Sequence, residues 1–359
     1  MKYIFLIFVV HVNFLFSQTY DNDNKQRATD KALEAIKLMD EGKIDESIIL
    51  LKESILLDSS NYMYPYELGY AYYIKKDYPN AILSFEKTIK YDMINDQCYQ
   101  MLGNAIDLNG DSIKAVEIYK KGLERFPKSG KLYLELGNIH QGNWMKAIEF
   151  YEKGIEVEPS FSSNYYWAAL FYCATEDEVW GVLYGEIFMN LERGSKRTEK
   201  ISKLLFDTYK QCIVISSDTS YNVSFAQNTI INTDKISELK NNLPYGLMVY
   251  EPTMCLSIIG VQDISLSSLN SIRKKFVSNY KLLKHNVNYP NIIFSWHEML
   301  IEKGFFDYYN YWLFMKGATD EFNIYYKEHS DKFQEFINWF KENPLVIDDE
   351  KYFHRKIYN

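Results

Sequence analysis

The feature that most constrains this 359-residue chain is a spacing of 34 residues between glycines. Gly69, Gly103 and Gly137, each preceded by a leucine, are separated by that interval, and apolar or aromatic residues recur at matching offsets downstream. A glycine in a helix interior costs roughly 1 kcal/mol relative to alanine, so three at one register indicate a packing requirement. A fixed period of this length predicts an array of stacked helical units.

The second half of each unit repeats as well. Ala81, Ala115 and Ala147 are each followed four residues later by an aromatic residue. Because helix backbones approach closely only where side chains are small, these alanines are predicted contacts between paired helices. Pro127 and Pro159 close two of the units, since a missing amide hydrogen stops a helix.

This pattern resembles the tetratricopeptide repeat (TPR), a pair of antiparallel helices that stacks into a superhelix. The resemblance covers residues 29–160 as four repeats. The first is degenerate, with Ala35, Ser47 and Leu51 at the repeating positions, and the fourth lacks two residues near Gly142. The resemblance implies an all-α fold, a TPR-type helical-hairpin solenoid.

Two further regions follow the repeats. Residues 161–213 are predicted to form a degenerate fifth repeat and a capping helix, because a terminal repeat must cover its apolar face. Residues 214–359 are predicted to be a mainly helical, aromatic-rich C-terminal domain, with strand or irregular loop at 221–231. The aromatic residues of 305–314 exceed what one helix face can bury, so this helix is expected to be surrounded or to meet a partner.

Residues 1–17 have the pattern of a secretory signal peptide. Lys2 is positive, residues 3–16 are almost wholly apolar, and Ser17 is small. We therefore expect an exported protein, periplasmic or extracellular, that does not insert into a membrane once the segment is cleaved. The alternative is an uncleaved helix that anchors the chain, because Leu15 is larger than export peptidases prefer.

Residues 18–28 are polar and are predicted to be a flexible lead-in. Residues 185–192 and 304–312 resemble segments of exported repeat proteins of unassigned function.

Charge and cysteine content restrict the partners. The formal net charge is −8, and removal of Lys2 with the signal segment leaves −8 − 1 = −9. An acidic chain is a poor binder of nucleic acid, so none is expected as a partner. The four cysteines are far apart and are predicted to be buried thiols, with one late disulfide as the alternative.

No motif for catalysis, a metal or a cofactor is evident. His297-Glu298 begins like a helical zinc-protease motif, but Ile301 stands where the second histidine ligand belongs. A glycine-rich phosphate loop and a nucleophile elbow are both missing from the sequence. We expect no metal, no cofactor and no enzyme activity.

Glu186 is the one unusual carboxylate, because it lies in the apolar run 179–191. A buried acid can be catalytic if its pKa is raised. A structural ion pair with Arg193 or Arg197 is the favoured prediction, since buried charges are usually partnered.

The TPR resemblance also implies a binding surface. In TPR arrays the first helix of each repeat lines the concave groove, and its residues that face away from the packing positions contact the ligand. In this sequence the candidates are Tyr66, Tyr70, Tyr73, Gln100, Asn104, Asp107, Lys131, Asn138, Gln141 and Tyr166. Asn104 and Asn138 match a position that family members use to hold peptide. Gln100 and Leu134 replace the accompanying lysine, so a clamp for a chain-terminal carboxylate is not expected.

The predicted function is therefore an exported protein-protein interaction scaffold that binds an extended peptide or partner protein in the groove. Amide side chains both donate to and accept from an extended backbone, and tyrosines add contact area at low entropy cost. One alternative is a glycan or small-molecule binder that uses the aromatic C-terminal domain, for example Trp312. An enzyme with an unrecognised site is the third. The groove residues could also be ordinary solvated side chains, or be covered by the C-terminal region.

Overall fold

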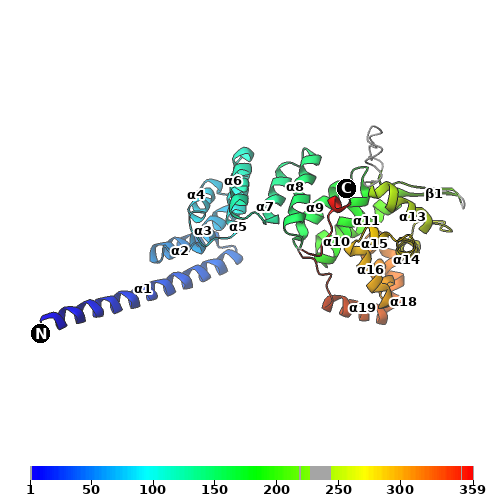
Figure 1. Ribbon diagram of the computed structural model, residues 1–359. Coiled ribbons are helices and arrows are strands. Elements are labelled where there is room, and N and C mark those ends of the chain that lie inside the picture. The colour runs from blue at the N-terminus through cyan, green and yellow to red at the C-terminus, as the bar shows by residue number, and fades with distance from the viewer. Residues whose placement is uncertain (1, 218–219, 227–243, 349, 359) are drawn as a thin grey trace. The chain divides into compact units, whose positions relative to one another are not determined.

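The computed structural model describes residues 2–217, 220–226, 244–348 and 350–358, with side chains described from residue 21 onward. The chain divides into two compact units, Met1–Ile139 and His140–Asn359, and each is described by itself. The boundary falls inside the predicted fourth repeat, while the expected domain limits at residues 160 and 213 stay predictions. Almost all regular structure is helical (Figure 1).

The first unit is a series of antiparallel helix hairpins. Its helices, in chain order, are α1 (Lys2–Asp40), α2 (Ile44–Leu57), α3 (Met63–Ile74), α4 (Tyr78–Thr88), α5 (Asp96–Leu108), α6 (Ser112–Arg125) and α7 (Gly130–Ile139). Consecutive helices pack as pairs, and first helices also contact one another, α3 with α5 and α5 with α7. This all-α arrangement of stacked hairpins is the TPR-type fold that the 34-residue period predicted.

The repeated glycines are contact points between paired helices. A Cβ atom at Gly69 would lie 2.7 Å from the ring of Phe85, and one at Gly103 would collide with the ring of Tyr119. Both glycines lie on the first helix of a pair and both rings on the second. The aromatic residue thus occupies the space that a side chain at the glycine would take.

The turns within two hairpins also repeat. Asp77 accepts a hydrogen bond from the backbone N–H of Asn80 (3.3 Å), and Asp111 accepts one from that of Lys114 (2.9 Å). Each aspartate therefore caps the first turn of its second helix. Gly110 precedes the second cap with φ +96°, a left-handed conformation that glycine adopts without strain.

The expected flexible lead-in at residues 18–28 needs correction, because helix α1 continues through it. Lys25 pairs with Asp21 one turn earlier, at 2.6 Å. Ala28 is fully buried, and with Ala32 and Ala35 it packs in a core shared with α2 and α3. Burial of this alanine face stabilises helix where the polar composition suggested none. None of the helices in the described part of the chain has the length and apolarity needed to cross a membrane.

The second unit is larger and more aromatic. Its elements, in chain order, are α8 (Trp144–Val157), α9 (Ser162–Tyr172), α10 (Glu178–Leu191), α11 (Lys196–Cys212), β1 (Ile213–Ser217), β2 (Ser220–Val223), a π-helix (Gly246–Tyr250), α13 (Glu251–Ser257), α14 (Leu266–Leu282), α15 (His285–Asn288), α16 (Ile292–Glu302), α17 (Phe306–Phe314), α18 (Thr319–Glu328), α19 (Ser330–Glu342) and a 3-10 turn (Arg355–Ile357). Helices α9 and α10 form the predicted fifth hairpin, and α11 packs against both.

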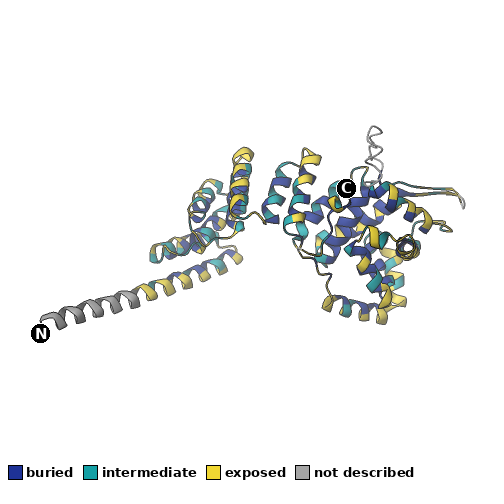
Figure 2. Cartoon of the chain, viewed as in Figure 1, coloured by how far each residue is buried: buried dark blue, intermediate teal, exposed yellow. Residues whose placement is uncertain are grey.

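Helix α10 is the centre of this unit, since every residue from Glu178 to Asn190 is buried (Figure 2). A helix that is apolar all round must be covered on all sides. Here α9, α11 and α16 pack against it. Helix α17 is similarly enclosed, which confirms that its dense aromatic residues are surrounded by other parts of the chain.

The small sheet and the cysteines bear on two further predictions. Strands β1 and β2 are antiparallel with Ile213 opposite Val223, so part of the ambiguous stretch 221–231 is strand; residues 227–231 lie outside the described residues. All four cysteines are free thiols. Cys98 and Cys212 are buried, but Cys255 is exposed, because it lies on the outer face of the short helix α13.

Candidate functional site

The predicted groove residues of the first unit lie on three of its helices, each the first helix of a repeat. Helix α3 carries Tyr66, Tyr70 and Tyr73, α5 carries Gln100, Asn104 and Asp107, and α7 carries Lys131 and Asn138. These eight residues, together with Glu135, are here named the polar face. All nine are partly or well exposed.

Two amides of the polar face meet at one carboxylate. Gln100 on α5 donates to Glu135 on α7 at 2.6 Å, and Asn138 donates to the same carboxylate at 3.1 Å. Asn104 accepts a hydrogen bond from the hydroxyl of Tyr119 at 2.5 Å. These bonds fix the orientation of the amides. Glu135 is not among the residues predicted from the sequence, although an acid one turn before Asn138 was a usable signal.

The tyrosines of α3 lie beside this network. Tyr73 packs edge-on against Tyr78, with 5.9 Å between ring centroids, while Tyr70 is 39% exposed. Burial raises the pKa of Tyr73, and the nearby charges of Glu135 and Asp107 raise it further. Residues from three successive hairpins therefore come close enough to interact electrostatically.

The charged members of the polar face have different partners. Lys131 lies 3.4 Å from Asp96, and both side chains are about one-quarter exposed, at 27% and 22%. Asp107 accepts a hydrogen bond from the hydroxyl of Ser112. The lysine is therefore compensated by a carboxylate, whereas Asp107 is bonded by a neutral donor.

The last two predicted groove residues belong to the second unit. Gln141 is exposed and donates to the hydroxyl of Tyr151 at 3.4 Å. Tyr166 is only 7% exposed, with its ring 5.2 Å from that of Phe188 and the guanidinium of Arg197 5.1 Å from its centroid. The prediction that Tyr166 is a surface contact is corrected, because side chains of α10 and α11 cover its ring.

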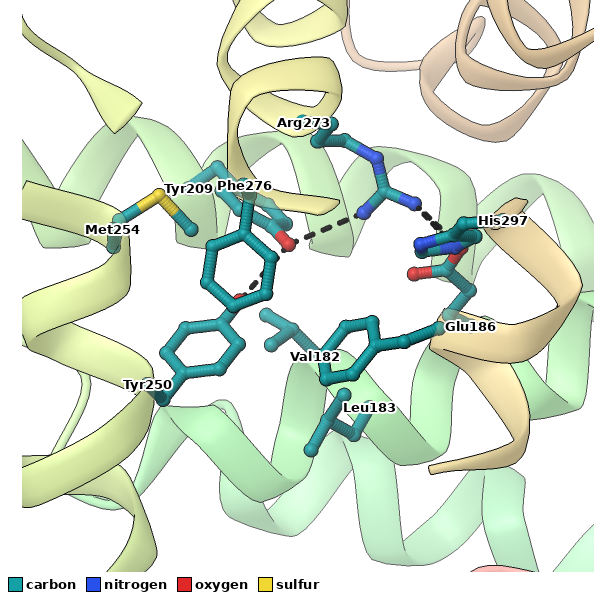
Figure 3. Close-up of a pocket in the computed structure, with 10 residues that line it drawn as sticks. Val182, Leu183, Glu186, Tyr209, Tyr250, Met254, Arg273, Phe276 and His297 are labelled. Atoms are coloured by element: carbon teal, nitrogen blue, oxygen red, sulfur yellow. Dashed lines mark hydrogen bonds and ion pairs between the residues drawn. The ribbon is translucent and has the colours of Figure 1, made fainter. Parts of the chain in front are cut away.

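A buried ionic cluster, named here the Glu186 cluster, lies in the second unit. Oε1 of Glu186 on α10 is 2.6 Å from the guanidinium of Arg273 on α14 and 2.6 Å from Nε2 of His297 on α16. The hydroxyl of Tyr309 on α17 donates to the same oxygen at 2.8 Å. Arg273 also donates to the hydroxyl of Tyr209 at 3.2 Å (Figure 3). Four helices are joined at one carboxylate.

The charge states in the cluster follow from its partners. Burial alone raises the pKa of Glu186, but the charge of Arg273 and the hydrogen bonds from Arg273 and His297 outweigh it and lower that pKa to about 2. Burial lowers the pKa of His297. We infer a carboxylate, a guanidinium and a neutral imidazole whose Nε2 proton is donated to Glu186.

The cavity beside the cluster is too small for a substrate. Its volume is about 10 Å³, and its walls include Glu186, Arg273, His297, Tyr250 and Phe276 (Figure 3). A cavity of this size holds at most about one water molecule. The arrangement therefore acts as a packed ionic link between helices.

The predicted partners of Glu186 were wrong. Arg197 donates to Glu192 at 2.9 Å. Arg193 donates to the backbone oxygen of Asn190 at 3.1 Å and stacks on Phe340. Both arginines follow the end of α10 at Leu191 and bond to groups near that end. The missed signal was Arg273 itself, a cation at an otherwise apolar register of α14.

A second buried carboxylate, Glu152 on α8, holds the end of the chain. It accepts hydrogen bonds from Nε of Arg355 at 2.6 Å, from the hydroxyl of Tyr172 at 2.9 Å and from that of Tyr184 at 3.1 Å. Its side chain is 1% exposed and that of Arg355 is 31% exposed. The pair of Glu152 and Arg355 was not predicted from the sequence, because the partners are separated by 203 residues.

The aromatic residues of α17 do not form an exposed stacking surface. Trp312 is 7% exposed, and its ring packs edge-on against Phe340 at 4.8 Å. Tyr309 is fully buried and bonded to Glu186. A sugar ring stacks on an exposed aromatic face, so these residues give no support to the glycan-binding alternative.

Known proteins are similar to parts of this chain. No family model matches the chain. The BBSome complex member BBS4 of Bos taurus is 32% identical over 103 residues, which are 27% of this chain and 20% of that protein. The chain therefore matches only a fifth of the length of that relative.

Several solved structures are similar at low identity. The crystal structure of MamA is 24% identical with a TM-score of 0.37 and covers 46% of this chain and 92% of that one. PilF of Pseudomonas aeruginosa is 13% identical with a TM-score of 0.44, over 53% and 86%. YrrB, described as a TPR protein with an unusual peptide-binding site, is 19% identical with a TM-score of 0.35, over 51% and 94%.

The class of protein is defined by the hairpins themselves, namely the 34-residue period and the packing of Gly69 and Gly103 against second-helix rings. The chain has a TPR-type fold, an all-α hairpin solenoid followed by a helical, aromatic-rich region.

Proposed function

We propose that this chain is an exported protein-interaction scaffold that binds an extended polypeptide segment on its polar face. The observation that carries the proposal is the bonding of two amides to one carboxylate. Gln100 on α5 and Asn138 on α7, the first helices of successive hairpins, both donate to Glu135. An amide whose N–H group is already bonded has a fixed orientation, so it meets a ligand without losing much side-chain entropy.

The tyrosines contribute contact area beside the amides. Tyr70 is 39% exposed, and Tyr73 is held by Tyr78. Tyrosine has few rotatable bonds, so it adds apolar contact at low entropy cost. An extended segment supplies the backbone donors and acceptors that amide side chains pair with. A dissociation constant near micromolar, about −8 kcal/mol, is sufficient for an assembly scaffold.

Two other features support the remaining parts of the proposal. The apolar segment at residues 3–16 after Lys2 supports export. The small volume beside the Glu186 cluster favours binding over catalysis as the role of the chain, because that cluster has no space for a reacting molecule.

The test is affinity capture with cross-linking from a cell-envelope extract. The full chain is compared with a variant that carries Asn104→Ala and Asn138→Ala. We expect the variant to lose the specific cross-linked partner while keeping the circular dichroism of the parent. The matched control is Asn323→Ala on α18, an exposed asparagine of the second unit. Capture that persists in the double variant would contradict the proposed surface.

A further inference from the structure

Two carboxylates of the polar face have no cation as an ion-pair partner within the described part of the chain. Glu135 is bonded by the amides of Gln100 and Asn138, and Asp107 by the hydroxyl of Ser112. Among the described residues, the ion pair of this face joins Lys131 to Asp96 and does not involve Asp107 or Glu135. Neutral donors hold a carboxylate in place but leave its negative charge uncompensated.

The two charges lie close to exposed aromatic surface. Burial is the main cause that raises the pKa of Tyr73, and Tyr78 raises it further; Glu135, Tyr70 and Asp107 lie close enough to contribute as well. Tyr70 lies one helical turn before Tyr73 and is exposed. A cation within about 6 Å of a tyrosine ring is attracted by the ring face. The carboxylates and the tyrosine rings of this face therefore both attract a positively charged ligand group.

Resting on the function proposed above, we propose that the polar face selects an extended segment that carries arginine or lysine side chains. Glu135 and Asp107 would pair with the cations, and Tyr70 and Tyr73 would pack on their alkyl chains and charged ends. Arginine is the better fit, because its planar guanidinium bonds a carboxylate through two N–H groups and stacks on aromatic rings. The negative charge of this face disfavours acidic segments by the same argument.

The experiment measures binding of three fluorescent peptides to the full chain. They share one unstructured Gly/Ser/Ala background and carry arginine, glutamine or glutamate at the same positions. We expect the arginine peptide to bind at least about tenfold more tightly than the glutamine peptide, and the glutamate peptide to bind most weakly. The preference for arginine should shrink as salt is raised from about 50 to about 500 mM.

The decisive variant combines Asp107→Asn with Glu135→Gln. It should remove most of the roughly tenfold preference for arginine, measured as the ratio of the affinities for the arginine and glutamine peptides. The matched control combines Glu117→Gln with Glu124→Gln. These exposed carboxylates lie on α6, the second helix of a hairpin, and the change in net charge is the same. The control should keep the preference.

The outcomes separate this inference from the proposed function. Equal binding of all three peptides, abolished by Asn104→Ala with Asn138→Ala, overturns charge selection and leaves the scaffold function standing. An equal loss of preference in the control variant also overturns it, because overall charge would then be the cause. Failure of every peptide to bind overturns both.

Discussion

Oε1 of Glu186 lies 2.6 Å from the guanidinium of Arg273, 87 positions later in the chain, and both side chains are almost fully buried. This contact links α10, the covered centre of the second unit, to α14 of the helical C-terminal region. Separating two buried charges leaves each of them buried without its counter-charge, which is unfavourable. The pair therefore resists displacement of the two helices.

Arg273→Met is expected to lower the free energy of unfolding by roughly 3–5 kcal/mol, because it leaves Glu186 as a buried charge without its main cation. Urea denaturation followed by tryptophan fluorescence measures the change. The control is Lys274→Met, which removes the adjacent cation from a partly exposed pair with Asp307 and should cost less than about 1 kcal/mol. Similar losses in both variants would contradict the structural role of the buried pair.

Stability should fall with decreasing pH in two windows. The pKa of Glu186 is lowered in the folded state to about 2 from an ordinary value of 4.5, so its contribution is complete above pH 4.5 and is lost as the pH falls towards 2. That contribution is on the order of 3 kcal/mol. His297 has a lowered pKa, so protonation of the unfolded chain reduces stability as the pH falls below 6.5.

Denaturation of the parent and of Glu186→Gln at several pH values tests this assignment. The variant should lose the slope between pH 4.5 and 2, since glutamine does not titrate. It should keep a slope just below pH 6.5 if His297 stays buried and neutral. An unchanged slope in the lower window would show that other carboxylates cause it.

The local part of this fold could be predicted from the sequence, because it depends on spacing within one repeat. The packing of Gly69 and Gly103 requires only the offset of 16 residues to the ring that fills the space. Two residues that lie on helices far apart in the sequence have no fixed offset that could reveal their contact. Arg273 could have been identified as unusual from its apolar surroundings on α14, but its partner could not, because the helix order in space decides it.

The candidate site shows the same limit. Asn104 and Asn138 follow the repeat and lie on the expected helices, whereas the bond from Gln100 to Glu135 depends on how two hairpins pack. The sequence predicts Tyr166 to be one of the groove residues. Its burial comes from α10, the second helix of the degenerate fifth hairpin, and from α11, which follows that hairpin.

Gly103→Ala is expected to destabilise the first unit by roughly 1–3 kcal/mol, because the added methyl group overlaps the ring of Tyr119 in a packed core. Thermal or chemical denaturation measures the effect. Gly142→Ala is the control, since a Cβ there meets no atom within 4 Å. A destabilised control with an unaffected Gly103→Ala would argue against the packing role of the repeated glycines.

Arg355→Ala is expected to release the end of the chain from α8. The change removes the cation from Glu152, which is almost fully buried. Its carboxylate then keeps, among the described residues, the hydroxyl groups of Tyr172 and Tyr184 as partners. The C-terminal segment after α19 should therefore open more often and be cleaved faster in limited proteolysis. Arg355→Lys keeps the charge and should restore part of the protection, whereas Lys356→Ala, at an exposed neighbour, should cleave at the parent rate. Equal cleavage rates in Arg355→Ala and Lys356→Ala would show that apolar contacts, such as that of Phe353 with Tyr184 at 5.6 Å, hold this segment without the ion pair.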